Sequence, residues 1–133
     1  MIKDWQKPTG CIVTIERLME LELPISRISQ GNSLSDVVYV EVINDNTLGL
    51  WVGIGRLKDG YHTGTNYAVQ TGEADGPVFC GRAGIPDKLE ALRAALQKAA
   101  QDWWITRHAG ARERIEAAIR GLDKYKAKQL TLF

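Results

Sequence analysis

The chain has 133 residues, a length that supplies one hydrophobic core and excludes most multidomain enzymes. Its composition, with 44% hydrophobic residues, 25% charged residues and 4 prolines, is that of a globular protein and excludes a disordered or collagen-like chain. The 17 basic and 16 acidic residues give a net charge of +1, so no bulk charge excess indicates a nucleic-acid or anionic-membrane partner.

The sequence contains few motifs that indicate a location or a chemical activity. Residues 1–5 are polar and no long apolar run follows them, so we expect a cytoplasmic protein without a signal peptide or membrane span. Cys11, Cys80, His62 and His108 lie in no metal-ligand or redox spacing. Without a paired-carboxylate or phosphate-loop signature either, we expect no catalytic residue, no metal and no cofactor, and a protein that is not an enzyme.

The first elements are short. Residues 11–23 fit two interpretations, because Ile12, Ile15 and Met19 share a helical face while Met19, Leu21 and Leu23 alternate with glutamates as in a strand. Residues 26–35 and 72–84 are rich in turn formers and are predicted to be loops.

Three strands are predicted in the centre of the chain. Residues 37–43 form a β-branched run that ends in Asn44-Asp45-Asn46, a sequence typical of turns. Residues 48–55 alternate aliphatic side chains with glycine and one tryptophan, which predicts a strand with two different faces. Asp59-Gly60 is a hairpin signal, and residues 61–71 form a third strand candidate.

Two helices are predicted to follow. Pro86-Asp87 is typical of a helix start, and an apolar stripe recurs at spacings of three and four up to Trp103, so we expect a helix to about residue 108. Trp103 lies on the stripe. Trp104 points about 100° away from it and would either cover the next helix or be exposed as a partner contact. After Gly110, a second helix carries Ile115, Ile119, Leu122 and Tyr125 on one face.

These elements predict an α+β fold: a small antiparallel meander of about three strands, covered by one or two C-terminal helices and followed by a flexible C-terminal tail. Residues 1–126 would form a single domain and residues 127–133 the tail.

Positive charge is concentrated near the tail. Residues 86–133 carry 10 basic and 6 acidic residues, whereas residues 1–85 carry 7 basic and 10 acidic. Seven candidate nucleic-acid contacts fall in the last predicted helix and its approach: Arg107, Arg112, Arg114, Arg120, Lys124, Lys126 and Lys128.

The sequence ends in Gln129, Leu130, Thr131, Leu132 and Phe133. This peptide resembles Gln-Leu-x-Leu-Phe, by which bacterial DNA polymerases, mismatch-repair and related proteins dock on the β sliding clamp. Four specified residues at one fixed position would match by chance in roughly one chain in 10⁴ to 10⁵. The clamp-binding box of eukaryotes and archaea continues to an aromatic pair that is not present here, so the resemblance implies a bacterial or bacteriophage setting. It also implies that Leu132 and Phe133 fill an apolar pocket and that Gln129 makes a polar contact.

Residues 64–100 are similar to small uncharacterised proteins of phages and plasmids, a resemblance that assigns no activity. The terminal peptide therefore leads to one hypothesis: a non-enzymatic accessory or inhibitory protein that docks on the bacterial sliding clamp and acts in or against DNA replication and repair. The alternative is a small nucleic-acid-binding protein that uses its basic C-terminal helix, with residues 130–133 packed on its own core. In the alternative, the protein binds DNA directly. In the first hypothesis, DNA lies close to the docked protein.

Overall fold

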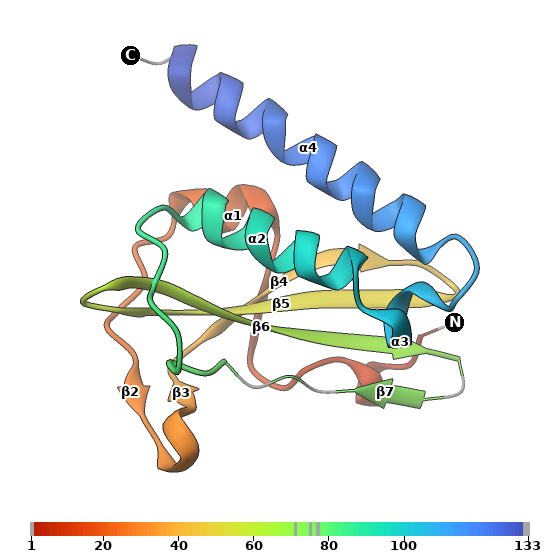
Figure 1. Ribbon diagram of the computed structural model, residues 1–133, viewed down its shortest axis with the longest axis horizontal. Coiled ribbons are helices and arrows are strands. Elements are labelled where there is room, and N and C mark those ends of the chain that lie inside the picture. Colours follow the sequence, from red (N-terminus) through yellow and green to blue (C-terminus); the bar gives the residue numbers. More distant parts are fainter. Residues whose placement is uncertain (1, 71, 75, 77, 132–133) are drawn as a thin grey trace.

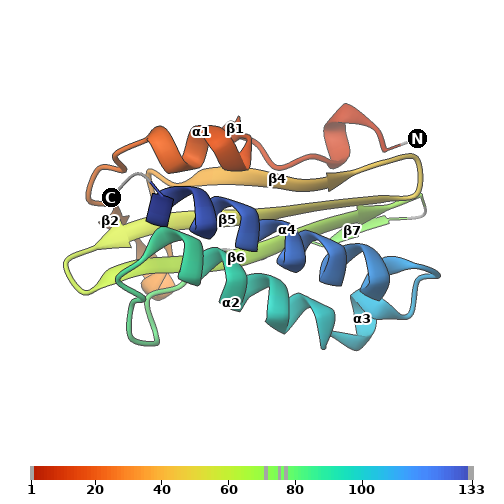
Figure 2. The ribbon, with the colours of Figure 1, turned by 90° about the horizontal axis from the view of Figure 1, so that it is seen from above.

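The computed structural model shows one five-stranded sheet with helices on one of its faces (Figures 1 and 2). The structure describes residues 2–70, 72–74, 76 and 78–131, of which residues 73, 74 and 127–131 are described by their backbone alone. The strands of this sheet lie in the order β1-β4-β5-β6-β7. Their bounds are β1 Cys11–Val13, β4 Val38–Asn44, β5 Leu48–Leu57, β6 Gly60–Val69 and β7 Gly72–Ala74.

The predicted meander is confirmed in its central part. β4, β5 and β6 are consecutive antiparallel neighbours, joined by the turns that the sequence predicted. The expectation of about three strands is wrong in number, since the described residues include β1, which pairs parallel with β4, and β7, which pairs with β6. Both additional strands have three residues, too few to show an alternating pattern in the sequence.

The two faces of β5 differ in the way its alternation predicts. Leu48, Leu50, Val52 and Ile54 are fully buried on the face that the helices cover. Trp51 is also fully buried, but it lies on the opposite face with Ile2, Ala68 and Tyr39.

Glycine is required on this second face because the tryptophan ring lies against the strand. A Cβ added at Gly49 would come within 2.3 Å of the Trp51 ring. At Gly53 it would lie 3.0 Å from Val78 and 3.1 Å from Tyr39. The glycines therefore make room for side chains that cover the sheet from below.

The N-terminal segment closes this lower face, which the sequence did not reveal. A 3-10 turn, η1 (Asp4–Gln6), buries Gln6, whose amide donates to the carbonyl of Val69 at 2.8 Å and to that of Gly72 at 3.3 Å. Ile2 packs beside Trp51. The sheet thus has a second, smaller core that is assembled from residues far apart in the chain.

Residues 11–23 contain both of the structures that their pattern allowed. β1 is followed by helix α1 (Ile15–Glu20), which begins at Thr14, whose hydroxyl accepts from the Arg17 amide. Leu18 of this helix is fully buried in the main core. The predicted loop over residues 26–35 contains a second small sheet, made of β2 (Arg27–Ile28), a 3-10 turn η2 (Gln30–Asn32) and β3 (Leu34–Ser35).

The helix predicted over residues 86–108 is divided into two. α2 (Lys88–Ala100) begins as expected at Asp87, whose carboxylate accepts from the Glu90 amide at 3.0 Å. It ends early because Asp102 caps a separate short helix, α3 (Trp103–Thr106), by accepting from the Trp104 amide at 2.8 Å. The placement of Trp103 on the apolar stripe was wrong: Ile105 is the buried residue of α3.

The last helix, α4 (Ala111–Thr131), is confirmed and forms an outer layer over α2 (Figure 1). Ile115 and Leu122 are fully buried, and Ile119 and Tyr125 pack partly buried against the same core. The backbone is helical through Thr131, which differs from the expectation of a tail that begins at residue 127.

Two glycine substitutions test this arrangement. Gly49→Ala is expected to destabilise the fold by about 1–3 kcal/mol because the added methyl group overlaps the buried Trp51 ring. Gly121→Ala meets no atom within 4 Å and lies inside α4, so it is expected to stabilise the fold by about 0.5–1 kcal/mol. Urea unfolding of both variants measures the two changes, and equal effects would contradict the packing described for Trp51.

Candidate functional site

The first candidate site is the C-terminal part of α4, which rises away from the sheet and from α2 (Figure 1). The last contacts described between α4 and the rest of the chain are made by Tyr125 and Lys126. The Tyr125 hydroxyl donates to the Glu16 carboxylate, and the Lys126 ammonium lies 3.5 Å from the Glu90 carboxylate. Lys126 is also the last residue of α4 whose side chain the structure describes, three residues before Gln129.

The docking peptide itself is described only in part. Gln129, Leu130 and Thr131 lie in the last turn of α4, but their side chains are outside the described residues. Leu132 and Phe133 are outside them entirely. Clamp docking by these five residues stays a prediction, as does the alternative that they pack on the core.

The six basic candidates whose side chains are described differ in their surroundings. Three of them have structural partners: Arg114 pairs with Asp45, Lys126 with Glu90, and Arg107 lies over two tryptophan rings. The side chain of Lys128 is outside the described residues. The remaining three are exposed and have no ion pair within the described part of the chain; they are Arg112, Arg120 and Lys124.

The pair between Arg114 and Asp45 fixes the start of α4 on the turn between β4 and β5. The Asp45 carboxylate accepts from the Arg114 guanidinium and from the amides of Thr47, at 2.9 Å, and Leu48, at 2.8 Å. Partial burial opposes ionisation of this carboxyl group. The hydrogen bonds from Arg114, Thr47 and Leu48 outweigh it, so the pKa of Asp45 lies well below its usual range.

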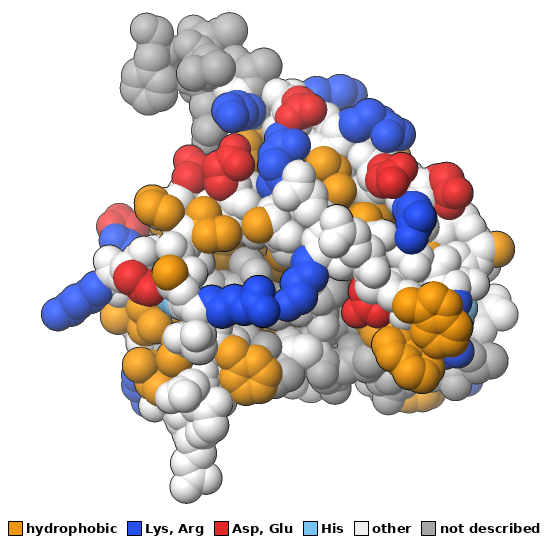
Figure 3. Space-filling model, in the orientation of Figure 1, with side chains coloured by type: hydrophobic (Ala, Val, Ile, Leu, Met, Phe, Trp, Pro, Cys, Tyr) orange, Lys and Arg blue, Asp and Glu red, His pale blue; other side chains and the backbone are white. Residues whose placement is uncertain are grey.

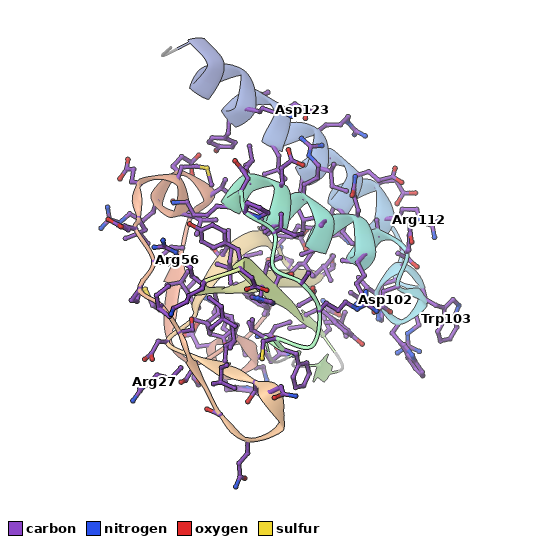
Figure 4. All side chains as sticks on the ribbon, turned by 60° about the vertical axis from the view of Figure 1, so that its left-hand side comes forward. Arg27, Arg56, Asp102, Trp103, Arg112 and Asp123 are labelled. Carbon is purple, nitrogen blue, oxygen red and sulfur yellow. The ribbon has the colours of Figure 1, made fainter. Side chains whose placement is uncertain are left out.

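The second candidate site is an exposed aromatic cluster on α3. Trp103 and Trp104 are 63% and 58% exposed. Their ring centroids are 5.1 Å apart in an edge-to-face arrangement, and the Arg107 guanidinium lies 5.4 Å and 4.9 Å from the two centroids. Figure 4 shows Trp103 pointing away from the body of the molecule. Of the two roles considered for Trp104, exposure is confirmed and packing on the next helix is wrong.

This cluster, Trp103, Trp104 and Arg107, is visible as hydrophobic side chains gathered over α3 (Figure 3). Tryptophan is enriched at protein interfaces, and the Arg107 guanidinium places a positive charge beside the π faces of both rings. Such a cluster is suited to contact a ligand that has both flat rings and negative charge.

Other chemistry is limited in the described ranges 2–70, 72–74, 76 and 78–131. No three His, Cys, Asp or Glu side chains there lie close enough together to hold a metal ion. In those same ranges, no helix has the length and apolar character needed to cross a membrane.

No protein-family model, no curated protein and no solved structure matches this chain. Its function must therefore be inferred from its own residues.

The Asp45 carboxylate gives a prediction on acid stability. Because its pKa is lower in the folded than in the unfolded chain, its ionised form stabilises the fold. This stabilisation is fully present above the unfolded pKa of about 4 and is lost as the pH falls below it. Asp45→Asn is expected to lower the free energy of unfolding at neutral pH and to flatten its decline in acid. Urea titrations over the acid range measure both effects, and an unchanged decline in the variant would contradict the role given to Asp45.

Proposed function

We propose that this chain is a non-enzymatic protein that docks on the bacterial DNA polymerase sliding clamp through residues 129–133, and that it acts in or against DNA replication or repair. The observation that carries the proposal is the sequence Gln129-Leu130-Thr131-Leu132-Phe133. Its four specified positions agree with the clamp-docking peptide that it resembles.

The packing of α4 supports this proposal. The apolar stripe that joins α4 to the core is already filled by Ala111, Ile115 and Leu122, with Tyr125 at its margin. Lys126, the last residue of α4 whose side chain is described, contacts the body through Glu90. A peptide that begins three residues later is well placed to reach a partner while the core stays closed.

Docking in an apolar cleft requires the last turn of α4 to open. The last four carbonyl groups of a helix have no intrahelical partner, so unwinding one terminal turn is inexpensive compared with opening the middle of a helix. Each large apolar side chain contributes about 1.5–3 kcal/mol to the free energy of binding when it is fully buried. The loss of conformational entropy when the peptide becomes ordered cancels several kcal/mol of this contribution. We therefore expect a dissociation constant that is roughly micromolar.

A second candidate function is nucleic-acid binding by the outer face of α4. The observation that favours it is the exposure of Arg112, Arg120 and Lys124 without ion-pair partners in the described structure. Glu113 and Glu116 lie among these cations and reduce the local positive charge. The two functions are compatible, because a clamp encircles DNA.

The clamp proposal is tested by isothermal titration of purified bacterial β clamp with the full chain. Leu132→Ala combined with Phe133→Ala is expected to weaken binding at least tenfold, since it removes two of the three apolar anchors. Thr131→Ala, at the variable position of the motif, is the matched control and is expected to bind like the parent. Equal affinity of the parent and the double variant, or no heat of binding for either, would overturn the proposal.

The second candidate is tested by gel shift with duplex DNA at increasing salt. Arg120→Glu combined with Lys124→Glu is expected to abolish any shift, because phosphate contacts dominate such affinity. Deletion of residues 129–133 is expected to leave it unchanged. A shift that survives the charge reversal would exclude α4 as the binding surface.

A further inference from the structure

A hollow of about 740 Å³ lies between α2, the edge of β6 and residues 79–85. Its walls include Tyr61, Thr63, Phe79, Arg82, Lys98 and Gln101. A smaller depression of about 180 Å³ continues it toward α3, with Thr63, Ala95 and Lys98 common to both and Asp102 and Ile105 at its far end. Together they form one groove under α2, which we call the α2–β6 groove.

The groove exists because small side chains face each other across it. Thr63 pairs with Ile54 and Thr65 with Val52, so both threonines point to the face that the helices cover. Above them, α2 presents Ala95 and Ala99 instead of its leucines, which pack in the main core. The short side chains of these threonines and alanines do not fill the space between α2 and β6.

Two positively charged side chains of the groove are free to bind a negatively charged ligand. Arg82 and Lys98 are exposed, and neither has an ion pair or hydrogen bond within the described residues. The acids close by are already engaged: the Asp59 carboxylate lies 2.9 Å from His62 Nε2 and accepts from the Gly84 amide at 2.8 Å, and Asp102 caps α3. The His62 hydrogen bond, followed by that of Gly84, lowers the pKa of Asp59 and keeps it ionised in this role.

One exposed aromatic ring lines the groove, and two more lie on the neighbouring helix α3. Phe79, 52% exposed, lines the larger hollow. Trp103 and Trp104 line neither hollow, but they lie on α3 next to Asp102 and Ile105, which line the smaller depression. Figure 3 shows basic side chains below α2 and hydrophobic side chains over α3 on one face of the molecule.

We propose that the α2–β6 groove binds single-stranded nucleic acid. Phosphates would lie against Arg82 and Lys98, and unpaired bases would stack on the indole rings of Trp103 and Trp104, where Arg107 adds a positive charge. A basic groove that tracks the backbone, combined with aromatic platforms for the bases, is the recurring design of proteins that bind single strands. Acidic side chains of a peptide would use the cations but carry no flat rings for the exposed aromatic faces, whereas every nucleotide supplies both a phosphate and a base.

This inference goes beyond clamp docking and uses none of residues 129–133. It also places nucleic acid on a different surface from the outer face of α4. Each surface can therefore be removed by substitution while the other is kept.

The experiment is a fluorescence-anisotropy titration of the full chain with a labelled oligothymidylate of about 15 nucleotides at several salt concentrations. Arg82→Ala combined with Lys98→Ala is expected to weaken binding and to reduce the slope of log affinity against log salt by about 1.4, or 0.7 for each lost phosphate contact. Lys3→Ala combined with Lys58→Ala removes the same charge from two exposed positions outside both the groove and α4, and is the matched control. Equal losses in the two double variants would show bulk electrostatics and overturn the proposal.

A second pair of variants tests stacking. Trp103→Ala is expected to weaken oligothymidylate binding about tenfold, the size typical of one lost base–aromatic contact. Trp5→Ala removes a similarly exposed indole, 67% exposed, from η1 and is expected to have no effect. Binding that is unchanged in Trp103→Ala, displacement of the oligonucleotide by polyglutamate at equal charge, or failure of the parent chain to bind would each contradict the proposal. Circular dichroism of every variant establishes that it is folded.

Discussion

The burial of β5 on both faces is the constraint on which the rest of the structure depends. Every residue from Leu48 to Gly55 is buried, whereas an antiparallel sheet commonly leaves one face in water. On one face, four aliphatic side chains of β5 are buried by the helices. On the other face, the Trp51 side chain must also be covered by other residues. The chain meets the second requirement with its N-terminal segment and the residues around Val78, which is why glycine alternates along β5.

This arrangement places α1, α2 and α4 on one side of the sheet and makes α4 an outer layer (Figure 1). α2 packs on the sheet with its leucines, and α4 packs on α2 and β4 through a narrow stripe that includes Ile115 and Leu122. The last described turn of α4, which ends at Thr131, points away from the sheet (Figure 1). The alanines of α2 open the groove above β6, because their short side chains do not fill the space over Thr63 and Thr65.

The sequence predicted those parts of the fold that local patterns encode. Alternation over residues 48–55 was long enough to identify β5, and Asp87 identified the start of α2 because its cap involves residues three apart. β1 and β7 were missed because they are defined by their partners. Asp102 is a residue type that favours the start of a helix, so the sequence did contain a signal for the break before α3. A helix that starts at Asp102 also places Trp103 off the apolar stripe of α2. The α2–β6 groove could not be predicted, since Arg82 and Lys98 come together only through tertiary structure.

The central claim is that the fold is complete without its terminal peptide, which stays free for a partner. The most direct measurement is the free energy of unfolding, by urea at neutral pH, of the chain that lacks residues 129–133 compared with the full chain. The account predicts a difference within about 0.5 kcal/mol, because surface changes away from the core rarely exceed that value. A loss of about 2 kcal/mol or more, the size typical of a removed core side chain, would show that Leu130, Leu132 or Phe133 belongs to the core and would contradict the account.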